Sequence, residues 1–236
     1  MNTHRIGILE QEIFPASGLV SYWRFDEGSG TSVADAKNAY NGTMSNTSGF
    51  YSGGKKKSCM ILSGGTYCSY GTFDTWTTSQ PYTFSCWIKL AYGGAGVVPI
   101  LSNLNSTTNA IIDPYIFESN GTFQFFIMYN NNVGRCAISV TSLITDTNWH
   151  LVVGSYNGDR NPANMKAYLD AVSKAATSST NTMSYTGALG TTLCTNRRST
   201  TTYTCNSMID EIGLWNRVLS QDEVTALYNL GTGLYY

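Results

Sequence analysis

The sequence predicts an all-β protein, a two-sheet antiparallel sandwich of the jelly-roll type. Apolar and polar residues alternate in many short segments, which is typical of strands with one buried face. Turn-forming pairs such as Asn41-Gly42, Gly64-Gly65 and Asn157-Gly158 lie between these segments. Good helix formers are scarce outside the C-terminal region. The expected strands cover residues 19–25, 66–70, 82–90, 123–129, 136–140, 149–156, 165–169 and 208–215.

The length of 236 residues is enough for one sizeable apolar core. Surface-to-volume scaling predicts that a chain of this mass buries roughly 70% of its unfolded surface. All-β chains of this length commonly form a single domain. We therefore expect an N-terminal arm over residues 1–17 and one jelly-roll domain over residues 18–236.

One short helix is expected at residues 221–230. Ser220 can act as its N-cap, and Glu223 then completes a capping box. Apolar residues recur along one face at i, i+3 and i+4. Gly231 is the residue type that ends helices in the left-handed conformation. Such a helix can cover part of a sheet but cannot form a helical domain.

The composition is poor in charge. Lys and Arg number 14 and Asp and Glu number 15, so the net charge is −1, and charged residues make up 12% of the chain. Soluble domains usually carry about 25%. Such a surface cannot hold a polyanion by counterion release, so we expect no nucleic-acid partner. No window approaches ~18 consecutive apolar residues, so no membrane span is expected. Abundant Ser, Thr, Asn and Tyr suit neutral sugars or contacts between subunits.

The arm at residues 1–17 does not resemble a secretory signal, because Glu10 and Glu12 interrupt its apolar residues. Its apolar residues, such as Ile6 and Phe14, predict that it packs either on its own domain or on a neighbouring chain. Packing on a neighbour would support a homo-oligomer or assembly into a particle. Phage particles assemble inside the cell, so their surface proteins need no signal. We therefore expect an extracellular surface or a virion as the location.

The cysteines do not predict a metal site. None forms a CxxC pair, and no histidine lies at metal-ligand spacing, so zinc is not expected. Cys194 with Cys205 is the best candidate disulfide, and Cys59 with Cys68 is the second. Without a secretory signal, free thiols are favoured over either pair.

Two strings of residues resemble one known family. LVSYWRFDEGSG (residues 19–30) opens the matching region and IDEIGLWNRVLSQDEV (residues 209–224) closes it, with further segments in the family's order across residues 18–231. These strings resemble the laminin-G-like, concanavalin A-like jelly-roll proteins. The resemblance implies two large curved antiparallel sheets whose first and last strands are neighbours. It also implies binding of glycans or proteins without catalysis, and many members carry one structural calcium ion.

The last expected strand, residues 208–215, contains a carboxylate in an apolar setting. Alternation places Asp210 on the same face as Ile212, with Glu211 on the opposite face. An unpaired charge among apolar residues is costly, so Asp210 needs a cation, an arginine or several backbone amides. If the first and last strands pair, Asp26 at the end of the first strand could lie close to Asp210.

These acidic residues predict a structural Ca²⁺ site. Calcium prefers carboxylate and carbonyl oxygens in flexible geometry. The expected ligands are Asp26, Asp35, Asn41 and Asp210. In the alternative interpretation, Asp26 caps the turn at residues 27–30 and Asp210 accepts hydrogen bonds from backbone amides.

The residues do not predict an enzyme. Glycosidases of the same fold resemble one another in an ExDxxE string on one strand, and this chain has no such string. Asp210 and Glu211 are adjacent, so alternation would prevent them from acting on one bond. His150 lies in an expected strand, where a lone histidine is more often packed and hydrogen-bonded than a catalytic base.

A sugar-binding site combines an aromatic ring, which stacks on the apolar face of the sugar, with amides or carboxylates that bind its hydroxyls. Trp23, Trp87, Trp149 and Trp215 are instead expected in core or sheet packing. Residues 130–132 fit a plain hairpin turn as well as a sugar site. The candidate ligand-binding residues are Trp76, Tyr92, Tyr115, Tyr129, Asn131, Asn161 and Asn164.

Two functions remain open from the sequence. One is a carbohydrate-binding, lectin-like module on a surface appendage or particle. The other is a structural or assembly protein, such as a phage virion decoration or appendage subunit. An arm embedded in a neighbouring chain would favour assembly, whereas a solvent-open cluster of aromatic and amide side chains would favour sugar binding. The expected partners are accordingly glycans or neighbouring protein subunits.

Overall fold

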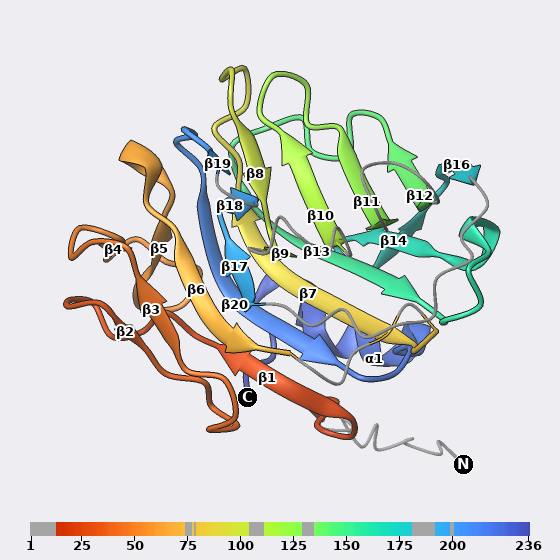
Figure 1. Ribbon diagram of the computed structural model, residues 1–236, viewed down its shortest axis with the longest axis horizontal. Coiled ribbons are helices and arrows are strands. Elements are labelled where there is room, and N and C mark those ends of the chain that lie inside the picture. Colours follow the sequence, from red (N-terminus) through yellow and green to blue (C-terminus); the bar gives the residue numbers. More distant parts are fainter. Residues whose placement is uncertain are drawn as a thin grey trace, which may run out of the picture.

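Two long antiparallel strands, β7 (Tyr82–Lys89) and β13 (Trp149–Tyr156), form the centre of the largest sheet. The computed structural model describes residues 13–73, 77, 79–103, 111–128, 135–180, 192–198 and 201–236. The large sheet has the order β15-β14-β13-β7-β20-β5-β4, and β1 also pairs with β20 (Figure 1). Its other strands are β1 (Leu19–Trp23), β4 (Phe50–Tyr51), β5 (Cys59–Ile61), β14 (Lys166–Leu169), β15 (Val172–Lys174) and β20 (Met208–Trp215).

Two five-stranded sheets form the second layer. Their orders are β16-β12-β11-β10-β8 and β2-β3-β6-β17-β9, and β9 lies beside β10. The first contains β8 (Val97–Pro99), β10 (Ile111–Phe117), β11 (Phe123–Met128), β12 (Arg135–Val140) and β16 (Thr177–Thr180). The second contains β2 (Ser32–Val33), β3 (Gly42–Met44), β6 (Cys68–Thr72), β9 (Ser102–Asn103) and β17 (Thr192–Thr195). A separate pair joins β18 (Arg197–Arg198) to β19 (Thr201–Thr202).

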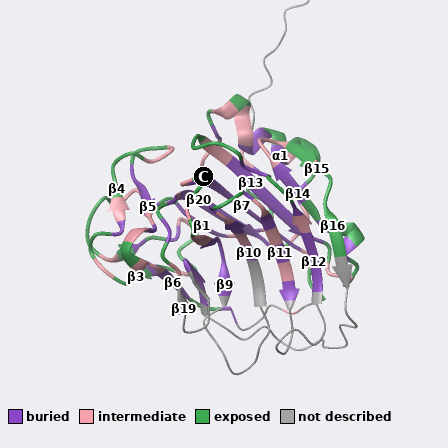
Figure 2. Cartoon of the chain, turned by 90° about the horizontal axis from the view of Figure 1, so that it is seen from above, coloured by how far each residue is buried: buried purple, intermediate pink, exposed green. Residues whose placement is uncertain are grey.

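The main core lies between these two layers. Phe84 of β7 contacts Phe125 of β11 edge to face, with ring centroids 5.3 Å apart, and Phe123 lies 6.2 Å from the same ring. Phe123 and Phe125 of β11 are buried and alternate with less buried residues, as expected for a strand with one face on the core. Figure 2 shows buried residues concentrated in the strands and exposed residues in the described connections. The predicted antiparallel jelly-roll sandwich is confirmed.

The first and last long strands are neighbours, as the family resemblance implies. β1 pairs with β20 in antiparallel register, with Trp23 opposite Ile212 and Tyr22 opposite Gly213. Trp23, Trp87 and Trp215 are buried. These three tryptophans therefore serve in packing, as predicted.

A short helix covers the outer face of the large sheet. Helix α1 (Gln221–Tyr228) has Ser220 as its N-cap and the expected capping box with Glu223. Its buried Val224 and Leu227 join a second apolar cluster with Trp215. The left-handed exit begins at Asn229, where φ is 43°, rather than at Gly231. The 3₁₀ turns are η1 (Ser63–Gly65), η2 (Pro162–Asn164) and η3 (Asn229–Gly231). Within the described part of the chain, no helix is long and apolar enough to cross a membrane.

The described end of the N-terminal arm packs on its own domain. The Phe14 ring contacts Tyr22 edge to face at 5.3 Å and lies 5.4 Å from Tyr236, near the other end of the sequence. The Trp215 Nε1 group donates a hydrogen bond of 2.6 Å to the Pro15 carbonyl. These contacts join residues near both ends on one face of the sheet. The rest of the arm, residues 1–12, lies outside the described residues.

All six cysteines are buried free thiols. The Cys194 thiol donates to the Ser102 carbonyl at 3.3 Å, and the Cys205 thiol lies 3.4 Å from Asn196 Oδ1. Neither candidate disulfide is formed. Burial raises the pKa of the Cys205 thiol to about 12, so this group is an unreactive thiol at neutral pH.

Candidate functional site

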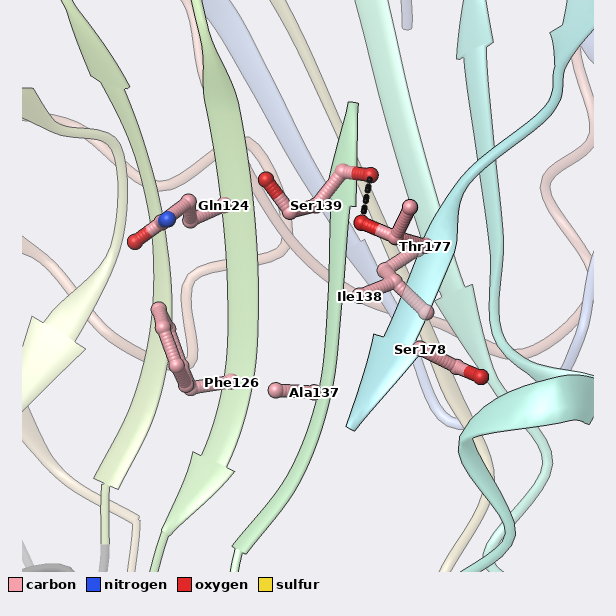
Figure 3. Close-up of a pocket in the computed structure, with 7 residues that line it drawn as sticks. All are labelled: Gln124, Phe126, Ala137, Ile138, Ser139, Thr177 and Ser178. Carbon is pink, nitrogen blue, oxygen red and sulfur yellow. Dashed lines mark hydrogen bonds between the residues drawn. The ribbon is translucent and has the colours of Figure 1, made fainter. Parts of the chain in front are cut away.

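The outer face of the second layer carries a small hollow of about 120 Å³. We call it the sheet hollow. It is lined by Gln124, Phe126, Ala137, Ile138, Ser139, Thr177 and Ser178, from strands β11, β12 and β16 (Figure 3). None of these seven side chains is charged. The hollow therefore offers an aromatic ring beside an amide and several hydroxyl groups.

Strand alternation produces the sheet hollow. Phe123 and Phe125 of β11 point into the core, so Gln124 and Phe126 point outward. Phe126 lies directly opposite Ala137 of β12 in the strand register. A small side chain at that position leaves space beside the phenyl ring, and this space forms the floor of the hollow.

Tyr115 is the predicted ligand-binding residue that the structure brings to this face. It lies on β10 opposite Gln124, and its hydroxyl donates a hydrogen bond to Gln124 Oε1. The Tyr115 ring stacks on Phe126 with centroids 5.6 Å apart and 12° between the planes. It also meets Phe117 edge to face at 5.3 Å. Three outward aromatic rings thus form one surface next to the hollow.

The other predicted ligand-binding residues do not line the sheet hollow. Tyr92 lies in the loop after β7 with 41% of its surface exposed. Asn161 accepts a hydrogen bond from the Ala163 amide, and Asn164 donates to Asp159 at 2.6 Å, so both hold the loop around η2 together. Trp76, Tyr129 and Asn131 lie outside the described residues.

None of the seven residues that line the hollow is among the predicted ligand-binding residues, and four of them supply its aromatic ring and polar groups: Gln124, Phe126, Ser139 and Thr177. A usable signal existed for the first two. In the run at residues 123–128 the alternation places one aromatic residue and one amide on the face opposite the core. Ser139 and Thr177 carry no comparable signal, because only the strand register brings them beside Gln124.

A second polar feature lies on β20, where the strand contains a bulge. Asp210 pairs with Trp87 but Gly213 pairs with Ser85, so β20 has one residue more than β7 in this interval. Glu211 occupies the left-handed region with a φ of 52°. The extra residue interrupts the alternation of faces. The expectation that Asp210 and Glu211 point to opposite faces is therefore wrong.

Both carboxyl groups lie close to Tyr22 and Tyr235. Burial is the largest influence on Tyr235, and the charges of Glu211 and Asp210 add to it, which together raise the pKa of its hydroxyl to about 12. The same two carboxylates add to the effect of burial on Tyr22, whose pKa lies well above its usual value. Asp210, Glu211 and these two tyrosines therefore form one cluster, in which Asp210, Glu211 and Tyr22 are buried and Tyr235 is partly exposed.

The two carboxylates of this cluster differ in the hydrogen bonds that they accept. Asp210 accepts hydrogen bonds from the Glu211 amide at 2.9 Å and the Lys56 amide at 3.2 Å. Burial, followed by the charge of Glu211, raises the pKa of Asp210 to about 9. Among the described residues, neither carboxylate oxygen of Glu211 has a hydrogen-bond partner. Burial is the largest influence on Glu211 and raises its pKa to about 7. The Tyr22 hydroxyl forms no hydrogen bond of normal geometry with this carboxylate, but it lies close enough to lower that pKa.

Asp26 lies near Glu211, where its charge contributes to raising the pKa of Glu211. One oxygen, Oδ2, forms an ion pair with Lys57 at 3.1 Å. The other, Oδ1, is buried and has no hydrogen-bond partner within the described part of the chain. Pairing of the first and last strands therefore brings an acidic residue from each end of the domain into one region.

Asp35 and Asn41 have a different role. The buried Asp35 carboxylate accepts four main-chain hydrogen bonds, from the amides of residues 22, 37, 39 and 40. Asn41 Oδ1 in turn accepts from the Asp35 amide at 2.9 Å. These hydrogen bonds hold the turn after β2 against β1, so the oxygens of both side chains already have main-chain partners.

Lysine side chains and the C-terminal residues cover this acidic region. Lys56 Nζ lies 3.9 Å from the centre of the Tyr235 ring, and Lys55 Nζ lies 4.1 Å from that of Trp87. Lys55 also donates to the Gly231 carbonyl. Asp210 and Glu211 are consequently almost fully buried, with exposed fractions of 0% and 2%.

His150 is held between two carboxylates. Its Nδ1 lies 2.7 Å from Asp170 Oδ2, and its Nε2 lies 2.9 Å from Asp146 Oδ1. The hydrogen bond with Asp170 is the largest cause of a raised His150 pKa, and the bond with Asp146 adds to it. Both ring nitrogens are therefore engaged, as expected for a packed, hydrogen-bonded histidine.

This arrangement predicts a pH-dependent contribution to stability. Because the folded pKa of His150 is raised, its two ion pairs stabilise the fold fully below the unfolded pKa and lose this effect as pH rises through the folded pKa. Wild type should exceed His150→Gln in free energy of unfolding by about 1 kcal/mol more at pH 5.5 than at pH 8.5. Urea unfolding at the two pH values measures the difference, and Asp146→Asn should reduce it by removing one partner. Equal differences at both pH values would contradict the prediction.

A match to a sequence-family model agrees with this fold. A sequence model of the concanavalin A-like lectin/glucanases superfamily matches residues 62–225, so the chain belongs to that family. The family contains both binding proteins and enzymes, as its description states. No protein of curated function matches the chain in sequence.

Solved structures show the same fold at low sequence identity. Trypanosoma rangeli sialidase matches with a TM-score of 0.66 at 15% identity, over 93% of this chain and 34% of the sialidase. The receptor binding domain of botulinum neurotoxin D matches with a TM-score of 0.63 at 12% identity, over 91% and 53% of the two chains. Domain 4 of AbnA, a GH43 extracellular arabinanase from Geobacillus stearothermophilus solved with arabinotriose, matches with a TM-score of 0.61 at 17% identity, over 88% and 96%. The chain thus spans about a third of the sialidase.

Proposed function

We propose that this protein is a non-catalytic carbohydrate-binding module and that the sheet hollow is its binding site. The observation that carries the proposal is the partly exposed Phe126 ring, which stacks on Tyr115 and lies beside the uncharged hydrogen-bonding side chains Gln124, Ser139 and Thr177. A sugar ring has an apolar face and a hydroxyl-bearing edge, so it matches a surface with both kinds of group. Similarity in fold to an arabinanase domain solved with arabinotriose supports this class of ligand.

Non-catalytic binding is proposed because of where the acidic residues lie. Glycoside hydrolysis usually needs two carboxyl groups that flank the scissile bond. The buried pair Asp210 and Glu211 lies on β20 of the large sheet, beneath Tyr235 and the lysines at 55–57, whereas the sheet hollow opens on the second layer. A saccharide in the hollow therefore does not reach this pair.

A titration panel tests the proposal. Wild-type protein is titrated calorimetrically with arabinotriose, xylotriose, cellotriose, mannotriose and 3′-sialyllactose, and each mixture is then analysed for released monosaccharide. We expect at least one neutral trisaccharide to bind with a Kd near or below the millimolar range, typical of a small open site, without release of sugar. Absence of binding across the panel would overturn the binding function, and release of monosaccharide would overturn its non-catalytic character.

We also propose that the acidic region of β1 and β20 binds one structural Ca²⁺. Among the described residues, no three His, Cys, Asp or Glu side chains gather closely enough to form a metal site on their own. However, Glu211 Oε1, Glu211 Oε2 and Asp26 Oδ1 are buried oxygens without hydrogen-bond partners in that same part of the chain. Calcium accepts carboxylates together with carbonyl and water oxygens, so these two side chains fit such an ion. Glu211 takes the place of Asp35 and Asn41 in the expected set, and Asp210 supports the bulge through its amide hydrogen bonds.

A further inference from the structure

A row of four polar side chains runs along this face: Gln124, Ser139 and Thr177 line the sheet hollow, and Tyr115 lies beside it. Tyr115 lies opposite Gln124, Gln124 opposite Ser139, and Ser139 opposite Thr177, in the registers of β10, β11, β12 and β16. Directly opposite residues in antiparallel strands are near neighbours on one face of the sheet. At the far end of the row, Thr177 Oγ1 donates to the Ser139 carbonyl at 3.3 Å (Figure 3).

Among the described residues, only the oxygen of the Gln124 side-chain amide has a hydrogen-bond partner. The Tyr115 hydroxyl donates to Gln124 Oε1, so the carbonyl end is occupied. Among the described residues, the Gln124 Nε2 group has no hydrogen-bond partner. An amide nitrogen carries two N–H donors. Gln124 therefore presents donors to the hollow while its acceptor faces Tyr115.

Tyr115 is itself fixed by two rings. Its ring stacks on Phe126 at 5.6 Å and meets Phe117 edge to face at 5.3 Å. Such contacts restrict the side chain to one orientation. The hydroxyl is consequently placed where it can hold the Gln124 carbonyl.

We propose that Tyr115 is a positioning residue that sets the hydrogen-bonding polarity of the sheet hollow and thereby selects an uncharged saccharide. This inference rests on the proposed carbohydrate-binding function. The sugar ring packs on Phe126, and one of its oxygens accepts a hydrogen bond from Gln124 Nε2. An acidic sugar is disfavoured, because none of the seven lining side chains is a cation that could compensate a partly desolvated carboxylate.

Three variants test the inference: Tyr115→Phe, Gln124→Glu and the double variant. Tyr115→Phe removes the hydroxyl that holds the amide, and Gln124→Glu keeps the size of the side chain but removes its N–H donors. We expect the Kd for the neutral trisaccharides of the panel to rise about fivefold in Tyr115→Phe and about tenfold or more in Gln124→Glu. Because Tyr115 acts through Gln124, the double variant should bind like Gln124→Glu alone.

A matched control and a stability measurement separate positioning from general damage. Tyr92→Phe removes a hydroxyl from an exposed tyrosine outside the hollow and should bind like wild type. The melting temperature of Tyr115→Phe should stay within about 2 °C of wild type, since the stacked ring is retained.

The possible results are distinguishable. If none of the trisaccharides binds wild type, the proposed function fails, and the inference fails with it. If wild type binds but Tyr115→Phe behaves like Tyr92→Phe, or if the losses of the two single variants simply add, only the positioning role is overturned. If 3′-sialyllactose binds as tightly as the neutral trisaccharides, the selection of uncharged sugars is overturned.

Discussion

Replacing Phe126 by alanine should weaken the binding of the neutral trisaccharides about tenfold or abolish it. The phenyl ring is the one aromatic side chain that lines the sheet hollow among the described residues. Stacking a sugar on it removes apolar surface of both partners from water. Fully burying a phenylalanine side chain stabilises a complex by about 1.5–3 kcal/mol. Partial burial at an open surface gives about half of that, and about 1.4 kcal/mol corresponds to a factor of ten in Kd.

The neighbouring Phe117 provides a matched control. It lies on the same outward face and contacts the same Tyr115 ring, at 5.3 Å, but it does not line the hollow. Phe117→Ala and Phe126→Ala should lower the free energy of unfolding by similar amounts, about 1 kcal/mol, because each loses one aromatic contact. Only Phe126→Ala should lose affinity in calorimetric titration. Equal losses of affinity in the two variants would show that the hollow is not where the sugar stacks.

The fold could be predicted from the sequence because its strands are amphipathic. Each long strand has one face on a core, so alternation marked β7, β11, β13 and β20 nearly to the residue. The N-cap of α1 was equally predictable, since a capping box is a local contact between Ser220 and Glu223. Contacts of this kind depend on residues close in sequence, which a reader of the sequence can pair without knowing the fold.

The candidate site was only partly predictable, for a physical reason. Tyr115 was identified as a candidate, but Gln124 and Ser139 reach it through the registers of three strands. Registers are set by the whole core and by turn geometry, not by the residues of the site. The residues around Phe126 are largely aromatic and apolar, as in a core segment. Only strand alternation shows that the Phe126 ring points outward while Phe123 and Phe125 point inward.

The bulge in β20 could not be predicted from alternation. Alternation assumes that every residue takes an extended conformation, whereas Glu211 adopts a left-handed one with a φ of 52°. Left-handed backbone at a residue other than glycine costs free energy and persists only where surrounding contacts hold it. One such contact is the hydrogen bond of 2.9 Å that the Glu211 amide donates to Asp210 Oδ1. Two adjacent acidic residues in a buried strand were the only signal that this interval is unusual.

Replacing Glu211 by glutamine should separate the calcium site from ordinary packing, because the substitution has opposite effects with and without the ion. In wild type, Ca²⁺ at 100 times its Kd would stabilise the fold by about 2.7 kcal/mol. For a chain of this size that raises the melting temperature by about 5–10 °C over an EDTA-treated sample. Glu211→Gln should lose most of this increase, because it replaces a charged ligand by a neutral one.

In EDTA the same variant should melt at a higher temperature than wild type. Glu211 is buried, and among the described residues its carboxylate oxygens have no hydrogen-bond partner, so without a cation its charge destabilises the fold. Glu118→Gln is the control: Glu118 is equally buried, but it accepts hydrogen bonds from the Asn206 amide, the Ser207 hydroxyl and the Gly96 amide. That variant should be less stable than wild type in EDTA and keep the full response to Ca²⁺, as measured by thermal unfolding. A wild-type melting temperature that does not respond to Ca²⁺, or a response that survives in Glu211→Gln, would mean that these unpaired oxygens do not bind calcium.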